Sequence, residues 1–334
     1  MSTVLQESLR PLRPRDLDAV IAIDAAHSGR SRRFYFERRL AAAARDAERH
    51  LQVALEEGGR LAGFMLGRAL EGEFGRSEPA LRLEAFGVAA GAQRHGIGRR
   101  LTAGLEAEAR RRGLHEIRTT ALWRQHELLG FLDHAGFALA PAHVLDCALD
   151  GAELGTAREQ PVERQPEPAD PNDYGTPRPA EFEPLARDRV EVGLLTAADI
   201  EGVARVDRRH AGRDRRGYLC RTLGEALADS AVRVSLAARV DGAVAGFVMA
   251  RMDYGDFGRA EPAAVIDTIG VDPLRARHGI GRALLSQLFV NLGALGIERV
   301  ETVAAPGNLE LLGFFYRAGL RPSQRLAFVK SLAS

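Results

Sequence analysis

Arg94-His95-Gly96-Ile97-Gly98-Arg99 is the stretch that decides the fold, because it recurs unchanged at residues 277–282. Each copy follows a short apolar run and precedes apolar residues at helical spacing, which predicts a strand, a glycine turn and a helix. Glycine turns let successive N–H groups point into one concavity, and a helix start adds unpaired N–H groups. A glycine turn can also serve steric needs alone, but duplication with flanking arginines, Arg99 and Arg282, favours a phosphate or pyrophosphate site.

The whole domain around this stretch is duplicated. A shift of 183 residues aligns the sequence with itself without a gap from about residue 13 to 140, and 19 of the 38 positions in 62–99 are identical to their counterparts. We therefore expect an N-terminal domain at 1–150 and a C-terminal domain at 190–334. Residues 151–189 hold seven of the chain's fifteen prolines, which predicts an extended, semi-rigid linker.

Each copy has the same predicted order of elements: one strand, two helices, three strands, and then a helix, a strand, a helix and a final strand. Gly58-Gly59 and Asp241-Gly242 mark hairpin turns between the second and third strands. This order predicts an α/β fold with a mixed sheet and helices on both faces. We expect the final strand to close its own unit.

Composition excludes several classes of function. The net charge of +1 and the 6% aromatic content give no reason to expect a nucleic-acid partner or an anionic membrane surface. Cys147 and Cys220 do not occupy equivalent places in the repeats, which fits a reducing cytoplasm. No apolar run reaches membrane-spanning length, and the nine histidines show no metal-ligand spacing, so we expect neither a membrane segment nor a metal.

Together the motifs resemble the GNAT superfamily of acyl-CoA-dependent N-acyltransferases, present in two copies. The superfamily's pyrophosphate loop reads Q/R-x-x-G-x-G/A, which the segment Gln93 to Gly98 matches fully, whereas Ala276 takes the first position in the second copy. After the next strand the superfamily often carries N-x-x-A-x-x-L-Y-x-x-x-G-F. Asn308 and Gly319 match this pattern in the second copy, where Phe315 replaces the tyrosine.

The resemblance implies acetyl-CoA or another acyl-CoA as co-substrate. The strands ending at Val88 and Val271 would splay from their neighbours, and their backbone N–H groups would polarise the thioester carbonyl. The residues expected to bind the cofactor are Val88, Gln93, Arg94, His95, Gly96, Ile97, Gly98, Arg99, Val271, Arg277, His278, Gly279, Ile280, Gly281, Arg282 and Asn308.

Three side chains are candidates for proton transfer under this resemblance. Glu84 and Asp267, four residues before the valines, would act as bases toward the amine, directly or through water. The alternative is that both are solvated or ion-paired strand carboxylates. Tyr316 would protonate the thiolate, but it lies one residue after the superfamily's tyrosine position, and a packing role is the alternative.

A second repeated motif, His27-x-Gly-Arg-x-Arg-Arg-x-Tyr and its copy from His210, falls where the first two helices meet. Three interpretations remain open: a solvated loop with the histidines capping or packing, recognition of an acidic group by arginine, or contact between the domains.

The function implied is transfer of an acetyl group from acetyl-CoA to a small-molecule or peptide amine by direct attack. We expect the chemistry in the second half, which keeps Asn308 and Tyr316. Two alternatives are a CoA-binding sensor with one or both halves inactive, and a Rossmann-type nucleotide module. The latter lacks the third spaced glycine. The halves are expected to form an intramolecular pseudo-dimer, and a homo-oligomer remains open.

Overall fold

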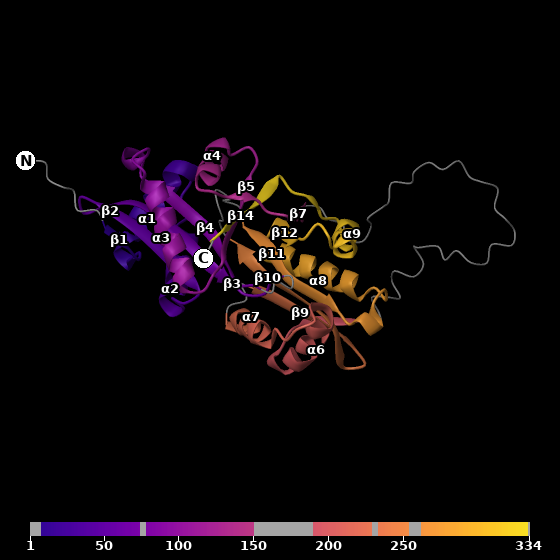
Figure 1. The fold of residues 1–334 in the computed structure, drawn as a ribbon. Coiled ribbons are helices and arrows are strands. Elements are labelled where there is room, and N and C mark those ends of the chain that lie inside the picture. Colours follow the sequence, from indigo (N-terminus) through magenta and orange to yellow (C-terminus); the bar gives the residue numbers. More distant parts are fainter. Residues whose placement is uncertain (1–7, 74–77, 150–189, 229–232, 254–261, 333–334) are drawn as a thin grey trace, which may run out of the picture.

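The computed structural model describes residues 8–73, 78–149, 190–228, 233–253 and 262–332. The predicted linker at 151–189 lies outside these ranges. Two sheets of seven strands each form the framework, with helices on both faces (Figure 1). This is the mixed α/β fold, present twice, that the sequence predicts.

The two halves repeat the same elements in the same order. The first half contains β1 (Ser8–Arg10), α1 (Leu17–Ser28), α2 (Arg33–Arg45), β2 (His50–Glu57), β3 (Arg60–Leu70), β4 (Ala80–Val88), α3 (Ile97–Arg111), β5 (Glu116–Leu122), α4 (His126–His134), β6 (Ala138–Leu139) and β7 (His143–Ala148). The second half contains β8 (Glu191–Leu194), α6 (Ile200–Ala211), α7 (Arg216–Ala228), β9 (Arg233–Val240), β10 (Ala243–Asp253), β11 (Ala263–Val271), α8 (Ile280–Ala294), β12 (Arg299–Ala304), α9 (Leu309–Arg317), β13 (Arg321–Pro322) and β14 (Arg325–Ser331).

The final long strands are exchanged between the halves. One sheet has the order β1-β2-β3-β4-β5-β14-β6, and the other has β13-β7-β12-β11-β10-β9-β8. In Figure 1, β14 from the end of the chain accordingly lies beside β5, and β7 lies beside β12. The expectation that each final strand closes its own unit is therefore wrong, because each one completes the sheet of the other half.

Matching hydrogen bonds hold the two crossing segments. The N–H of Ala140 donates to the carbonyl of Ala327 at 2.8 Å, and the N–H of Ser323 donates to the carbonyl of Val144 at 2.9 Å. Beyond the crossing, β14 pairs with β5 in antiparallel register from Arg325 to Ser331, and β7 pairs with β12 along its full length. The exchange therefore preserves the backbone pairing that a strand of the same half would have provided.

The hydrophobic cores also take side chains from the opposite half. Phe328 of β14 lies in the cluster that α3 forms with the first sheet, and Leu145 of β7 lies in the cluster that α8 forms with the second. On β3, Met65 faces α3 whereas Phe64 and Leu66 face α1 and α2, as the alternation of side chains along a strand requires. Each sheet is thus covered on both faces, and each half depends on the other for part of its core.

The exchange predicts that the halves stay together without a covalent link. If a protease site is placed within 151–189 and cut, the two fragments should co-elute as one particle in size-exclusion chromatography, since β14 and β7 remain paired. Phe328→Asp is the control that puts a charge into the shared core and should weaken the association. Wild-type fragments that elute separately would contradict the exchange.

Candidate functional site

Both repeated loops adopt the same backbone conformation. Gly96 and Gly279 have φ angles of 77° and 78°, and Arg94 and Arg277, two residues earlier, have φ angles of 64° and 65°. Such left-handed angles are uncommon outside glycine, and their recurrence at equivalent positions shows that the loop geometry is a property of the repeat. The residues from Gln93 to Gly96 are exposed, so the concave face of the first loop is open to a ligand.

Each loop leads directly into a helix whose first residue is anchored in the core. Ile97 and Ile280 are buried, and the first intrahelical bond runs from the N–H of Arg100 to the carbonyl of Gly96. The N–H groups of the first helical turn therefore have no partner inside the helix, and they lie at the positive end of its dipole. This combination binds phosphate groups in many proteins.

The two glycines of each loop serve different purposes. A Cβ atom on Gly98 would lie 2.8 Å from Cε2 of Phe131 in α4, and one on Gly281 would lie 3.0 Å from Cε2 of Phe314 in α9. Among the residues that the structure describes, no heavy atom lies within 4 Å of a Cβ placed on Gly96. The first glycine is thus needed for the turn, and the second for close packing of the neighbouring helix.

The strands that precede the loops do splay. The parallel ladder between β4 and β5 consists of two residue pairs, Leu81 with Ile117 and Arg82 with Arg118. β11 pairs with β12 over the two equivalent positions. Beyond the ladder, the hydroxyl of Thr119 donates to the carbonyl of Leu83 at 3.1 Å. The hydroxyl of Thr302 makes the same bond in the second half. Among the described residues, β4 and β11 make no further ladder pairs with β5 and β12 beyond these two positions.

The last residues of these strands direct their backbone groups into the gap. Ala89 donates its N–H to Ala62 of β3 at 2.9 Å. Backbone groups alternate in direction along a strand, so the N–H and carbonyl of Val88 face the opposite way. Val271 has the same orientation, because Asp272 donates to Ala245 at 2.8 Å.

A histidine contacts each of these carbonyls. Nε2 of His27 lies 3.0 Å from the carbonyl oxygen of Val88, and Nε2 of His210 makes the equivalent hydrogen bond to Val271. Both histidines lie in the last turn of a helix, α1 or α6, and both are exposed. Capping or packing was one of the roles left open for these histidines; the contact with the valine carbonyl was not predicted, although their recurrence at equivalent places in the repeat was a signal.

Glu84 lies in the core of the first half, between two arginines. It is the extra residue of a β-bulge in β4, and 7% of its surface is exposed. Its carboxylate contacts Nε of Arg39 at 2.6 Å and Nε of Arg68 at 3.2 Å. Burial raises the pKa of Glu84, but the charges of these arginines outweigh it and hold the pKa below its usual value. A buried, ion-paired carboxylate of lowered pKa is a weak base, so these contacts favour the ion-paired alternative.

Asp267 has an equivalent environment. It is the extra residue of the bulge in β11, it is 2% exposed, and its oxygens contact Nη1 of Arg233 at 2.8 Å and Nε of Arg251 at 3.1 Å. In each half, one of the two arginines comes from the third strand: Arg68 from β3 and Arg251 from β10. The second arginine is Arg39 of α2 in the first half but Arg233 of β9 in the second half. The ion-paired carboxylate is therefore maintained by arginines at different positions of the repeat.

The carboxylate site of the second half is linked to the first half by ion pairs. Glu225 of α7 contacts Nε of Arg233 at 2.5 Å, and it also forms an ion pair with Arg49 of the first half. Burial raises the pKa of Glu225, but the charges of Arg233 and Arg49 outweigh it and lower the pKa to about 2. Asp267 thus belongs, through Arg233 and Glu225, to a charged network that reaches Arg49 of the first half.

The arginines of the second repeated motif are mainly structural. Arg32 forms a buried ion pair with Asp24 that joins the start of α2 to α1, and Arg215 pairs with Asp207 in the same way. Arg215 also donates to the carbonyl of Gly72 in the first half. Of the three interpretations left open, contact between the domains therefore holds for Arg215.

Tyr316 lies on the surface of α9, next to Arg321. Its side chain is 59% exposed, and the guanidinium of Arg321 lies 4.0 Å from its ring centroid. The position of the superfamily's tyrosine is taken by Leu132 in one half and Phe315 in the other, both with no exposed surface. These observations favour packing as the role of Tyr316, since no phenol occupies the superfamily's position in either half.

The other predicted ligand residues lie around the loops. Arg94, His95, Arg99, Arg277, His278 and Arg282 are exposed on the loops or the adjacent helix. The side chain of Asn308 accepts a hydrogen bond from the N–H of Leu311 at 3.1 Å, which caps α9. The cap fixes the start of the helix that packs on Gly281.

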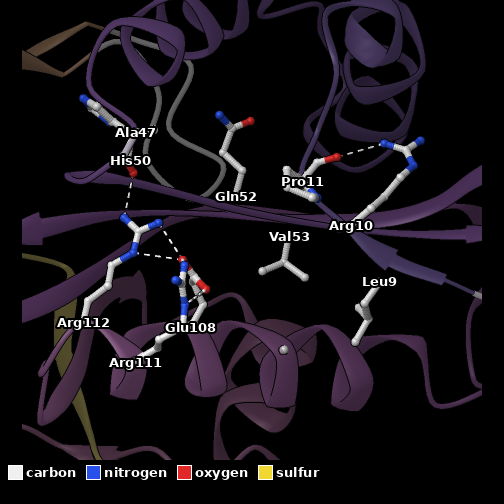
Figure 2. A pocket seen from close by; sticks show the side chains of 11 residues that line it. Leu9, Arg10, Pro11, Ala47, His50, Gln52, Val53, Glu108, Arg111 and Arg112 are labelled. Atoms are coloured by element: carbon white, nitrogen blue, oxygen red, sulfur yellow. Dashed lines mark hydrogen bonds and ion pairs between the residues drawn. The ribbon is translucent and has the colours of Figure 1, made fainter.

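A cavity of about 350 Å³ lies elsewhere, between α3 and the strands β1 and β2 (Figure 2). It borders the C-terminal part of α3, whereas the predicted phosphate loop precedes its N-terminus. Glu108 holds Arg111 and Arg112 by ion pairs, and Arg112 also donates to the carbonyl of Ala47 at 2.6 Å. The cavity is therefore separate from the predicted site, and its charged side chains are already paired.

Two further findings concern the described residues. No helix among them combines the length and apolar character needed to cross a membrane. In the same parts of the chain, no three His, Cys, Asp or Glu side chains gather closely enough to hold a metal ion.

Related sequences match short parts of the chain. Mycothiol acetyltransferases of Clavibacter michiganensis subsp. michiganensis (strain NCPPB 382) and of Clavibacter sepedonicus are each 34% identical over 110 residues. These residues make up 33% of this chain and 33% and 34% of the two relatives. The chain thus matches about a third of the length of these relatives.

Solved structures match almost the whole chain in fold. A tandem GNAT protein from the clavulanic acid biosynthesis pathway superimposes with a TM-score of 0.63 at 17% identity, covering 98% of this chain and 99% of that one. A GCN5-related N-acetyltransferase from Sphaerobacter thermophilus gives a TM-score of 0.57 at 15% identity, covering 98% and 96%. At these identities the likeness concerns the fold alone.

The acetyltransferase (GNAT) family matches residues 17–137 and 205–320, which together make up more than half of the chain. Each match contains one glycine loop and one splayed strand, and each ends before the exchanged strand of its half. On this match and on the fold, the protein belongs to the acetyltransferase (GNAT) family and carries two copies of its domain.

Proposed function

We propose that each half binds acetyl-CoA at its loop and that the protein transfers the acetyl group to the amine of a small molecule or peptide by direct attack. The observation that carries this proposal is the paired geometry of loop and strand. Loop and helix N–H groups would hold the pyrophosphate, and the N–H of Val88 or Val271 would polarise the thioester carbonyl at the end of the gap.

The relatives support acetyl as the transferred group, because the two Clavibacter proteins bear the name of acetyltransferases. The family supports an amine acceptor in the same way. The acceptor would approach the end of β4 or β11 next to the exposed histidine. The strand exchange supports the proposal that the two sites act within one intramolecular pair.

A second candidate is a CoA-binding protein in which one or both halves do not turn over. The buried Leu132 and Phe315, which replace the superfamily's tyrosine, favour it, since neither can donate a proton. An exposed site can still protonate the leaving thiolate from water, so the absence of a phenol slows the reaction without forbidding it.

The first prediction from this proposal concerns stoichiometry. Calorimetry with CoA should show two sites per chain. Gly96→Val and Gly279→Val should each remove one of them, because a β-branched residue is strained at φ near 77°. Gly130→Ala and Gly293→Ala, which introduce a methyl group into open space, are matched controls and should leave both sites intact. A wild-type protein without any CoA site would contradict the proposal.

A second prediction separates the enzyme from the binding protein. With acetyl-CoA and a panel of phenethylamine, spermidine, glucosamine and the dipeptide Ala-Ala, free thiol should appear in step with acetylated amine. Mass spectrometry of the product identifies the acceptor. Two bound CoA molecules without thiol release from any amine would favour the binding protein.

A third prediction tests the role of Glu84. Glu84→Gln leaves the charges of Arg39 and Arg68 buried without their partner, and it should lower the free energy of unfolding by about 3–5 kcal/mol. Glu37→Gln, which breaks an exposed pair with Arg33, should leave it nearly unchanged. Urea denaturation measures both. Unchanged stability together with lost turnover would instead support Glu84 as a base.

Glu84→Gln should also change how the stability of the protein depends on pH. The folded-state pKa values of Glu84 and Glu225 lie below the unfolded value of about 4.3. Their contribution to stability is therefore complete above that pH and is lost as the pH falls toward the folded-state values. Wild-type stability should fall below about pH 5, and Glu84→Gln should flatten the fall. Identical slopes would contradict the ion-paired role.

A further inference from the structure

Deprotonation of the acceptor is the step for which the buried carboxylates are poorly placed. A general base must reach the amine and must exchange its proton with solvent. Glu84 and Asp267 are almost fully buried, and each is held between two arginines. The titratable side chains that both halves place at the end of the splayed strand are His27 and His210.

The contact with the carbonyl defines the state of each ring. A backbone carbonyl only accepts hydrogen bonds, so Nε2 of His27 carries the hydrogen in its contact with Val88. In the neutral imidazole, Nδ1 then holds a lone pair and can accept a proton. Among the described residues, neither His27 nor His210 has a partner at Nδ1.

The position of the ring is set by the fold. His27 and His210 are followed two residues later by Gly29 and Gly212, which end their helices in the left-handed conformation. Cδ2 of His210 lies 3.6 Å from a Cβ placed on Gly270, so the ring lies over the strand residue just before Val271.

This position brings the ring next to the reacting bond. The N–H of Val88 or Val271 would bind the thioester oxygen, and the carbonyl of the same residue binds the histidine. Both groups belong to the same strand residue, and a strand advances by about 3.3 Å per residue, so the two groups lie close together. An amine that attacks the thioester carbon from the solvent side would therefore approach beside this exposed ring, whose Nδ1 is the nitrogen that the carbonyl does not engage.

Resting on the function proposed above, we infer that His27 and His210 are the general bases that deprotonate the acceptor amine. The amine nitrogen forms a bond to the thioester carbon, and its proton moves to Nδ1. The carbon–sulfur bond then breaks, and the CoA thiolate takes a proton from water. The imidazolium returns its proton to solvent, so the products are the acetylated amine and free CoA.

The structural alternative is that each histidine only positions the carbonyl of the valine. Glutamine distinguishes the two roles, because its side-chain amide can donate to the same carbonyl but cannot act as a base. The test compares His27→Gln/His210→Gln with His27→Ala/His210→Ala in the full chain. His134→Gln is the matched control, because His134 is also an exposed histidine bonded to a backbone carbonyl, that of Gly130 at 2.6 Å.

The assay uses acetyl-CoA and whichever of phenethylamine, spermidine, glucosamine and Ala-Ala the wild-type protein acetylates fastest. Both double variants should lose about 10²–10⁴-fold in kcat/KM. CoA affinity, measured by calorimetry, should stay within about threefold of wild type. Added imidazole should raise the kcat/KM of the alanine double variant at least about tenfold, because the site is exposed. It should not change the kcat/KM of His134→Gln.

Wild-type activity in the glutamine double variant would overturn the inference and leave the histidines as positioning residues. Parallel loss of CoA affinity and turnover without rescue by imidazole would overturn it as well. A wild-type protein that releases no thiol with any of the four amines would contradict the proposed function itself. The two failures are therefore distinguishable, since one appears in the variants and the other in the wild type.

Discussion

The pairing of β14 with β5 and of β7 with β12 is the constraint on which the rest of the structure depends. It completes both sheets, and it places Phe328 and Leu145 in the cores of the opposite halves. Neither sheet has its full set of strands without the other half. The stability of each loop is therefore tied to the whole chain, and substitutions in one half are expected to affect the other.

A charged interface between the halves accompanies the exchange. With the strands crossed, α7 contacts the first half, so that Arg49, Glu225 and Arg233 form a continuous set of ion pairs leading to Asp267. Removing ions from water is costly, and a buried carboxylate is tolerated only where several donors surround it. The bulged carboxylates of the two halves meet this condition with arginines from different elements.

Much of the fold was predictable because it is local or repeated. The duplication, the mixed sheet, the hairpin turns at Gly58-Gly59 and Asp241-Gly242, and the glycine turns at Gly96 and Gly279 all follow from patterns in short windows. The exchange was not predictable in this way. The segments that form β7 and β14 would have the same apolar alternation in either sheet, so their partner depends on long-range geometry.

The site was predictable where the backbone determines it and less so where side chains do. The loops and the splayed strands lie where their motifs indicated. The sequence identified Glu84 and Asp267 as acids on the strand. It did not predict their ion pairs, because Arg39 and Arg233 occupy different positions of the repeat and therefore form no shared motif. His27 and His210 were noticed as a repeated motif, while their contact with the valine carbonyls depends on how α1 and α6 cross the sheet.

The central claim is that two equivalent sites hold the thioester at the ends of β4 and β11. A crystal structure of the full chain soaked with acetyl-CoA tests this most directly. We predict one molecule in each half, with its pyrophosphate on the backbone of residues 93–98 or 276–281 and its thioester oxygen on the N–H of Val88 or Val271. A molecule bound elsewhere, such as in the cavity beside Glu108, with both loops empty, would contradict the account.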